Sequence, residues 1–343
     1  MLNELDRIPQ GLLELQAQQL ADALQGPTLI TLRGMREPPL FVSVLLHGNE
    51  TTGWEAVRRL LREYEPGGGV RPLPRTLVLF IGNVDAARHR LRRLDGQPDY
   101  NRSWPGGKGY VSAETSLMDQ VTALMRQRGL FASIDIHNNT GLNPHYACVN
   151  VVNNRFLRLA TLFSRLVIYF IRPRGVQSLA FAKFCPAVTI ECGKVGDAAG
   201  IRHTQQFVDA CLHLHDLSDE NLAHTEVDLF HTVATVKIPV DLEFGFGAHH
   251  QLGLDPQLER FNFSELPVGT HWGDTNGEEM PFVVTSESGE LVAEDYFELQ
   301  QGRLVNCVPV MPSMLTRDER VIRQDCLCYL MERYKLKTRQ AAN

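Results

Sequence analysis

Runs of consecutive apolar residues alternate with helix-like spacings along the first two-thirds of the chain. The segment 41–46 is apolar and predicts a buried strand, and Val57, Leu60, Leu61 and Tyr64 then recur at the spacing of one helix face. Strands that alternate with helices predict an α/β domain with parallel, right-handed crossovers. The same patterns predict further strands at 27–32, 76–81, 131–137, 145–149, 166–170 and 187–193, and further helices at 3–25, 113–128, 154–165 and 205–217.

The pattern changes near residue 225, where short β-rich pieces separated by glycine and proline turns replace the alternation. The pieces 232–238, 281–285 and 302–308 predict a small antiparallel β subdomain. Apolar residues between 317 and 336 then predict a closing helix. We therefore expect a catalytic α/β domain over residues 1–222, a β-rich subdomain over 223–316, and a C-terminal helical segment over 317–343.

Composition narrows the class of protein. The 343 residues are 43% hydrophobic and 22% charged, which is typical of a globular protein, and the net charge of −6 disfavours nucleic-acid binding. We expect no membrane span, because no apolar run approaches about 18 residues, and no signal peptide at the acidic N-terminus. The seven cysteines are scattered, and only Cys326 and Cys328 lie close together. That spacing is too short for a zinc pair, so reduced thiols and a cytoplasmic location are predicted.

The first candidate site follows the strand at 41–46. His47 and Glu50 lie in the turn between this strand and the next helix, at the sheet edge where α/β proteins bind ligands. An imidazole and a carboxylate three residues apart can converge on one ion, and a distant histidine would complete a catalytic zinc site with one position left for water. The alternative is an acidic residue in the first turn of a helix, favoured by the helix dipole, beside an unrelated histidine.

Two other strands end on polar side chains. The strand at 131–137 ends on His137, so two strands deliver a histidine to what should be the same edge. Glu191 ends the strand at 187–193, where a buried carboxylate costs free energy unless it is paired or functional. Asp135 lies on the same strand as His137 and would orient a ligand imidazole, unless it is only a strand-end residue.

Further candidate residues lie in the segment between the predicted strands at 76–81 and 131–137. Four arginines fall within residues 88–93, of which Arg88 and Arg90 are expected on a solvated face. Asn101 and Arg102 follow in a loop, where an amide and a planar guanidinium are suited to holding a carboxylate.

Four motifs, in this order, resemble the succinylglutamate desuccinylase/aspartoacylase branch of the zinc carboxypeptidase superfamily. They are His47-Gly48-Asn49-Glu50, Asp99-Tyr100-Asn101-Arg102, Asp135-Ile136-His137 and Glu191-Cys192-Gly193-Lys194. The resemblance covers roughly residues 40–200. It implies a three-layer α/β/α sandwich on a mixed central sheet, with a C-terminal β subdomain that shapes the substrate entrance.

The resemblance also implies roles for individual residues. One zinc ion would be bound by His47, Glu50 and His137, and Glu191 would be the general base. The substrate carboxylate would be held by Asn101 and Arg102. The scissile carbonyl would be polarised by Arg92 or Arg93, and the spacing to Leu94-Asp95 favours Arg92.

The chain also departs from the family pattern. Tyr100 replaces the usual leucine of the second motif, and the segment 177–182 is apolar where aspartoacylases carry an arginine for the acyl-side carboxylate. The dicarboxylic acyl groups of the family are therefore in question, although Glu191-Cys192-Gly193-Lys194 is closer to the desuccinylase version.

The resulting hypothesis is a zinc-dependent amidohydrolase that deacylates a small substrate with a free carboxylate, such as an N-acyl amino acid. Two alternatives stay open: a carboxypeptidase-like enzyme acting on a small peptide, and a non-catalytic metabolite-binding protein. No nucleic-acid or membrane partner is expected, and the oligomeric state is open, with a homodimer as one alternative.

Overall fold

The computed structural model describes residues 1–107, 109–220, 222 and 225–335 of the chain. It divides into two compact units: Met1–Asn138 with His145–Asp228, and Asn139–Pro144 with the chain from Leu229 onward. Among the described residues, no helix has the length and apolar character needed to cross a bilayer.

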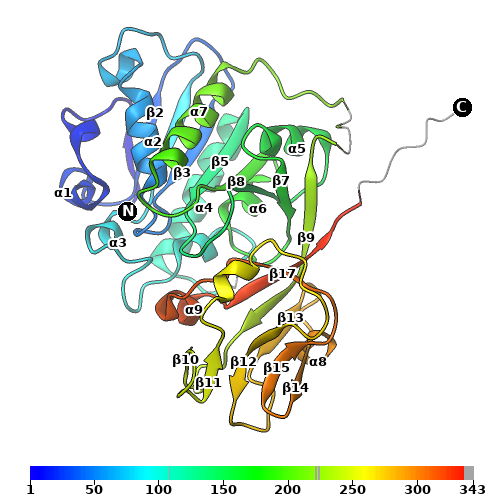
Figure 1. Ribbon diagram of the computed structural model, residues 1–343. Coiled ribbons are helices and arrows are strands. Elements are labelled where there is room, and N and C mark those ends of the chain that lie inside the picture. Colours follow the sequence, from blue (N-terminus) through cyan, green and yellow to red (C-terminus); the bar gives the residue numbers. More distant parts are fainter. Residues whose placement is uncertain (108, 221, 223–224, 336–343) are drawn as a thin grey trace, which may run out of the picture. The chain divides into compact units, whose positions relative to one another are not determined.

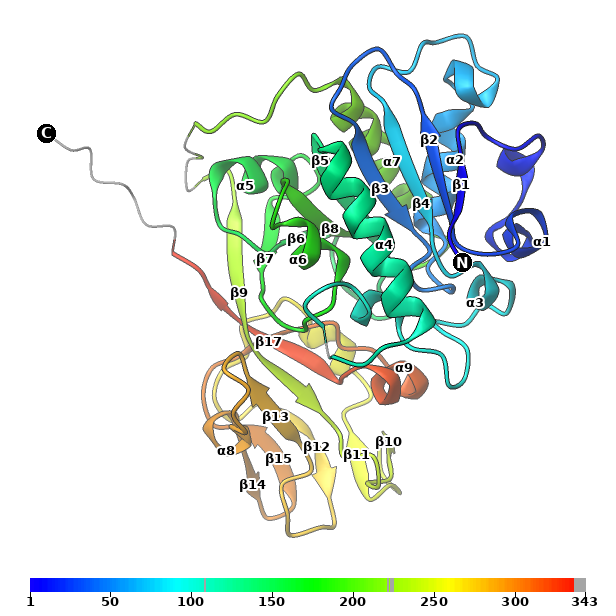
Figure 2. The ribbon, with the colours of Figure 1, turned by 180° about the vertical axis from the view of Figure 1, so that it is seen from behind.

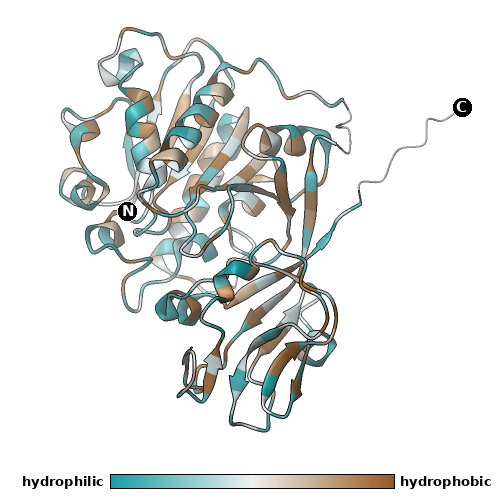
Figure 3. Cartoon of the chain, viewed as in Figure 1, coloured by the Kyte–Doolittle hydropathy of each residue, from teal (hydrophilic) through white to brown (hydrophobic). Residues whose placement is uncertain are grey.

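The first unit is built on a mixed β-sheet (Figure 1). Its order is β1 (Asn3–Leu5), β2 (Thr28–Leu32), β4 (Leu77–Ile81), β3 (Leu40–Val44), β5 (Ala132–His137), β8 (Ala187–Glu191), β6 (Tyr146–Val149) and β7 (Leu166–Tyr169). Strands β4, β3, β5 and β8 run parallel, whereas β2 is antiparallel to β4 and β6 is antiparallel to β8. These four parallel strands are buried along their whole length, which explains their near-continuous apolar runs (Figure 3).

Helices cover both faces of this sheet. Figure 1 shows α2 (Thr52–Leu61) and α7 (Ala198–His213) on one face, and the reverse view of Figure 2 shows α4 (Ala113–Arg128) and α6 (Gln177–Phe181) on the other. The predicted three-layer α/β/α architecture is confirmed. The shorter helices are α1 (Leu20–Leu24), α3 (Val84–Arg88) and α5 (Asn154–Thr161), with 3-10 turns η1 (Leu12–Glu14), η2 (Ala17–Gln19), η3 (Glu65–Gly67) and η4 (Tyr100–Arg102).

The second unit is mainly antiparallel, as predicted. Strand β9 (Asp228–Lys237) pairs with β13 (Val283–Ser286) and β17 (Cys328–Arg333), and β17 pairs with β16 (Met311–Ser313). A separate sheet has the order β10 (Phe244–Phe246), β11 (Leu252–Leu254), β12 (His271–Thr275), β15 (Arg303–Asn306) and β14 (Phe297–Gln300), in which only the β10–β11 pair is parallel. Beside them lie η5 (Leu258–Phe261), α8 (Ala293–Tyr296) and α9 (Glu319–Gln324).

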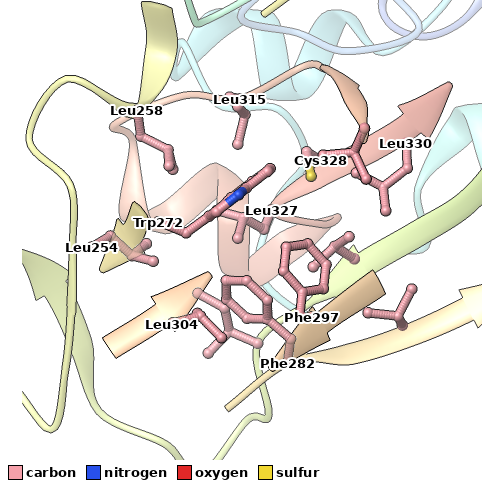
Figure 4. Packing of buried hydrophobic residues seen from close by; sticks show 14 of the residues in the cluster. Leu254, Leu258, Trp272, Phe282, Phe297, Leu304, Leu315, Leu327, Cys328 and Leu330 are labelled. Carbon is pink, nitrogen blue, oxygen red and sulfur yellow. The ribbon is translucent and has the colours of Figure 1, made fainter. Parts of the chain in front are cut away.

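An apolar core of its own stabilises the second unit (Figure 4). The indole of Trp272 is fully buried, with the ring of Phe297 at 5.1 Å and that of Phe261 at 5.8 Å, both edge-on. Leu327 and Leu330 reach the same cluster from the C-terminal part of the chain.

Two predicted helices are wrong. Residues 3–25 form a short strand, two 3-10 turns and α1, because Pro9 and Gly11, which has a φ of 77°, interrupt the leucine pattern. The closing helix predicted at 317–336 is α9 followed by strand β17, since the run from Cys326 to Met331 is apolar at every position and pairs with β9 and β16. Residues 336–343 of the predicted C-terminal segment, and residues 223–224 beside the predicted 222/223 boundary, lie outside the described residues. The helix predicted at 205–217 is α7, which begins earlier, at Ala198.

Candidate metal centre

Three neighbouring parallel strands deliver the candidate residues to one edge of the sheet. His47 and Glu50 follow β3, His137 ends β5, and Glu191 ends β8. In the pairing of β5 with β8, His137 lies directly opposite Glu191. The order of connection reverses between β3 and β5, and ligands of α/β sheets bind at such a point.

The chain between β3 and α2 adopts a constrained conformation. Leu45 is fully buried and has a φ of 57°, in the left-handed region where a non-glycine residue costs on the order of 1–2 kcal/mol. Gly48 approaches α3 so closely that a Cβ would lie 2.2 Å from the backbone nitrogen of Ala87, and its N–H donates to the carbonyl of Arg92 at 3.1 Å. These features turn the chain so that His47 and Glu50 face the same space.

His47, Glu50 and His137 converge at this edge, all buried. Their candidate ligand atoms lie within 4.8 Å of one another. The Nδ1 atom of His47 is 2.8 Å from Glu50 Oε1, and Nδ1 of His137 is 2.8 Å from Glu50 Oε2. Two imidazoles therefore present the same ring nitrogen to one carboxylate.

The other ring nitrogen of each histidine meets a second carboxylate. Nε2 of His47 is 3.1 Å from Asp99 Oδ1, and Nε2 of His137 is 2.8 Å from Asp135 Oδ2. An imidazole that donates Nε2–H to a carboxylate has its Nδ1 lone pair free for a metal, which is the usual arrangement around histidine-bound ions.

This donor set fits a divalent cation. His47 faces carboxylate oxygens with both nitrogens, so a neutral ring leaves one of the two contacts without a proton, and either an imidazolium or a bound cation satisfies both. Glu50, Asp135 and Glu191 are buried at this edge. A divalent ion among these groups would offset buried negative charge, and two nitrogen ligands with one oxygen ligand suit zinc.

The surroundings shift the pKa values of the carboxyl groups in opposite directions. The two facing imidazoles outweigh burial and lower the pKa of Glu50, and Arg92 and His47 likewise outweigh burial and lower that of Asp99. Burial raises the pKa of Glu191 to about 8, aided by the negative Glu50. Of these three carboxyl groups, Glu191 therefore has the highest affinity for a proton.

Of the two candidate arginines, the structure brings Arg92 to the centre. Its guanidinium donates to Asp99 Oδ2 at 3.1 and 3.2 Å and lies 3.7 Å from Glu50 Oε1. Arg93 instead donates to the carbonyl of Gln97 at 2.8 Å, within its own loop.

The two residues expected to hold the substrate carboxylate, Asn101 and Arg102, lie in different surroundings. Asn101 is buried against the metal centre, with Nδ2 at 3.0 Å from His137 Nε2 and Oδ1 accepting the Gln177 N–H at 3.0 Å. Arg102 is half-buried and donates to the Asn101 carbonyl at 2.9 Å. Asn101 therefore contacts groups within the protein, and Arg102 is the more exposed of the two.

Comparison with known proteins agrees with this geometry. A model of the succinylglutamate desuccinylase/aspartoacylase catalytic domain matches residues 37–215, more than half of the 343-residue chain. The chain belongs to the succinylglutamate desuccinylase/aspartoacylase family. The matched segment of this family member contains all of the candidate residues described above. A comparison with curated protein sequences found no significant match.

Solved structures share the fold of this family member at low sequence identity. The succinylglutamate desuccinylase of Chromobacterium violaceum is 18% identical, with a TM-score of 0.58, over 89% of this chain and 87% of that one. Murine aminoacylase 3 is 17% identical, with a TM-score of 0.58, over 87% of this chain and 97% of that one. A succinylglutamate desuccinylase/aspartoacylase from Rhodobacter sphaeroides is 15% identical, with a TM-score of 0.57, over 89% and 88%.

The sequence predicted no role for Asp99, although this residue opens the motif Asp99-Tyr100-Asn101-Arg102. Its Oδ1 contacts His47 Nε2 and also accepts the Asn101 N–H at 2.7 Å, capping η4. An aspartate that precedes a short helical turn is a capping signal, which was readable, but its contact with a histidine 52 positions away was not.

The close approach of Gly48 predicts a stability effect. We expect Gly48→Ala to lower the free energy of unfolding of this protein by about 1–3 kcal/mol, because the added methyl group must displace α3. Gly109 is the matched control, since it is exposed and a Cβ there would meet no atom within 4 Å. Gly109→Ala should be neutral or slightly stabilising. Urea unfolding checks both, and equal midpoints for Gly48→Ala and the parent would contradict the close approach.

The raised pKa of Glu191 predicts a pH dependence of stability in the metal-free protein. Between its ordinary pKa of 4.5 and about 8, Glu191 keeps its proton in the folded state and loses it on unfolding. The folded state then binds more protons, so the free energy of unfolding falls as pH rises, by up to ~1.4 kcal/mol per unit. We expect Glu191→Gln to flatten the slope between about pH 5 and 6, below the ordinary range of histidine. Denaturant titrations with a chelator present check this, and an unchanged slope would contradict it.

Proposed function

We propose that this chain is a zinc-dependent amidohydrolase that deacylates a small carboxylate-bearing substrate such as an N-acyl amino acid. The observation that carries the proposal is the convergence of His47, Glu50 and His137, with Glu191 on the adjacent strand, in a member of this family. The relatives named as desuccinylases and as an aminoacylase support the substrate class.

Each residue is assigned a separate task in hydrolysis. His47, Glu50 and His137 would hold one zinc ion, which when bound supplies a Lewis acid beside the scissile amide. In its ionised form, which a nearby divalent cation favours, Glu191 would accept a proton from the attacking water and return it to the leaving nitrogen as the C–N bond breaks. The products are a carboxylate and a free amine.

Two arginines complete the assignment. Arg92, held by Asp99, would stabilise the negative charge that develops on the carbonyl oxygen, a contribution of about 3–4 kcal/mol for one such donor in other enzymes. Arg102, with Asn101 beside it, would hold the substrate carboxylate and so fix the position of the amide.

A substrate panel tests this function. Zinc-loaded protein is assayed for amine release from N-acetyl, N-butyryl, N-benzoyl and N-succinyl amino acids, from their carboxamide analogues, and from dipeptides. We expect hydrolysis of at least one N-acyl amino acid and much slower hydrolysis of its carboxamide analogue, because the carboxylate contact with Arg102 is lost. Preferential cleavage of dipeptides would favour the carboxypeptidase alternative. Zinc binding without hydrolysis of any substrate would favour the binding-protein alternative.

A further inference from the structure

One buried side chain connects three segments of the metal centre. Asn138 follows His137 and is only 4% exposed. Its Oδ1 accepts the Thr52 N–H at 3.1 Å, and its Nδ2 donates to Thr52 Oγ1 and to the Gly193 carbonyl, both at 2.8 Å. A carboxamide has one acceptor and two N–H donors, so every polar group of this side chain has a partner.

The first of these contacts replaces a missing helix cap. Thr51 is the N-cap residue of α2, but its side chain makes no capping hydrogen bond. The first N–H groups of a helix have no partner within the helix, and Asn138 supplies one from the end of another strand. The turn that carries Glu50 is thereby attached to β5.

The backbone of Asn138 reinforces the same connection. Its N–H donates to Glu50 Oε2 at 3.0 Å, on the oxygen that also faces Nδ1 of His137. The orientation of the Glu50 carboxylate therefore depends on how residue 138 is held.

The remaining contact reaches the segment after the general base. Gly193 lies two residues beyond Glu191 and has a φ of 74°, a conformation that glycine adopts without strain. This conformation directs its carbonyl to Asn138 Nδ2. The side chain thus connects the ligand turn at Glu50 with the loop that leaves Glu191.

We propose that Asn138 is a positioning residue that fixes the Glu191 segment relative to the metal ligands. The inference rests on the proposed function for the roles of Glu50 and Glu191. Asparagine suits the task because its carboxamide offers one acceptor, for the Thr52 N–H, and two N–H donors, for Thr52 Oγ1 and the Gly193 carbonyl.

Two substitutions separate the two contacts. Asn138→Asp keeps an oxygen for the Thr52 N–H, where a negative charge at a helix N-terminus is favourable, but removes the donor to Gly193. Asn138→Ala removes all three hydrogen bonds of the side chain. Asn150→Ala is the matched control, since Asn150 is also buried and donates to the Phe170 carbonyl at 2.9 Å, just beyond the ends of β6 and β7.

Three measurements on the full-length chain test the proposal: zinc affinity by competition with a chelator, hydrogen exchange of the segment 192–197, and kcat on the best N-acyl amino acid of the panel. We expect Asn138→Ala to weaken zinc binding about 10- to 100-fold, as for other partners of metal ligands. Asn138→Asp should keep zinc affinity within tenfold, speed exchange at 192–197, and lower kcat at least tenfold with little change in KM. Asn150→Ala should match the parent in all three while losing thermal stability.

Parental exchange and kcat in Asn138→Asp would overturn the proposal, as would equal zinc affinities in Asn138→Ala and Asn150→Ala. If Asn138→Ala does not fold, Asn138→Asp carries the test alone. A parent chain that binds no zinc would refute the proposed function instead, and the exchange comparison would still decide whether Asn138 fixes the loop.

Discussion

Replacing Glu191 with glutamine should reduce turnover by roughly 100- to 10,000-fold, the usual contribution of a general base. Glutamine keeps the size and one oxygen of the side chain, but it cannot accept the proton that the attacking water loses. Because Glu191 lies beside the three candidate ligands rather than among them, zinc content should stay that of the parent. The measurement is kcat on an N-acyl amino acid, together with elemental analysis of the same sample.

The paired readout makes this prediction specific. Loss of activity together with loss of zinc would indicate that Glu191 is a ligand, which contradicts the assignment. Hydrolysis by Glu191→Gln at the parental rate would contradict the proposed mechanism, because the general base would then be a different group.

Replacing His47 with alanine should abolish zinc binding at stoichiometric concentrations. The substitution removes one of the two nitrogen donors, and with it the imidazole that contacts both Glu50 and Asp99. The loss should exceed the roughly 100-fold that removal of an outer partner of a metal ligand causes. Zinc per chain after dialysis, measured by elemental analysis, checks this.

The control for His47→Ala is His213→Ala. His213 is exposed at the end of α7, where its ring is 2.9 Å from the carbonyl of Asp209. Its removal should leave zinc content unchanged. If His213→Ala lost as much zinc as His47→Ala, the binding would be non-specific and the metal centre would be refuted.

The central sheet and the convergence of the candidate ligands were predictable because the signals were local. Apolar runs fixed the buried strands, and the residues that end them follow directly in the sequence: His47, His137 and Glu191. The carboxyl ends of parallel strands share one edge, so the convergence of these side chains followed from the strand assignments alone.

The loops could not be predicted, because their conformations depend on contacts between distant segments. Arg92 faces the centre partly because its carbonyl accepts the N–H of Gly48, a contact across 44 positions, whereas Arg93 is drawn to Gln97. The role of Asn138 likewise depends on Thr52 and Gly193, which lie 86 and 55 positions away. The family resemblance favoured Arg92 over Arg93, but no pattern within the sequence encodes the contacts that hold Arg92 and Asn138.

The prediction of a closing helix at 317–336 failed for a different reason. The residues from Cys326 to Met331 are apolar on both faces of either a helix or a strand, so their periodicity does not choose between the two. Pairing with β9 and β16 decides in favour of the strand.

X-ray absorption at the zinc edge of the zinc-loaded chain tests the central claim most directly. The account predicts one zinc per chain with nitrogen and oxygen neighbours at about 2.0–2.1 Å, outer-shell scattering from two imidazoles, and no sulfur neighbour. Sulfur at about 2.3 Å would assign the metal to the cysteines instead. That result, or a chain that retains no zinc, would contradict a site built from His47, Glu50 and His137.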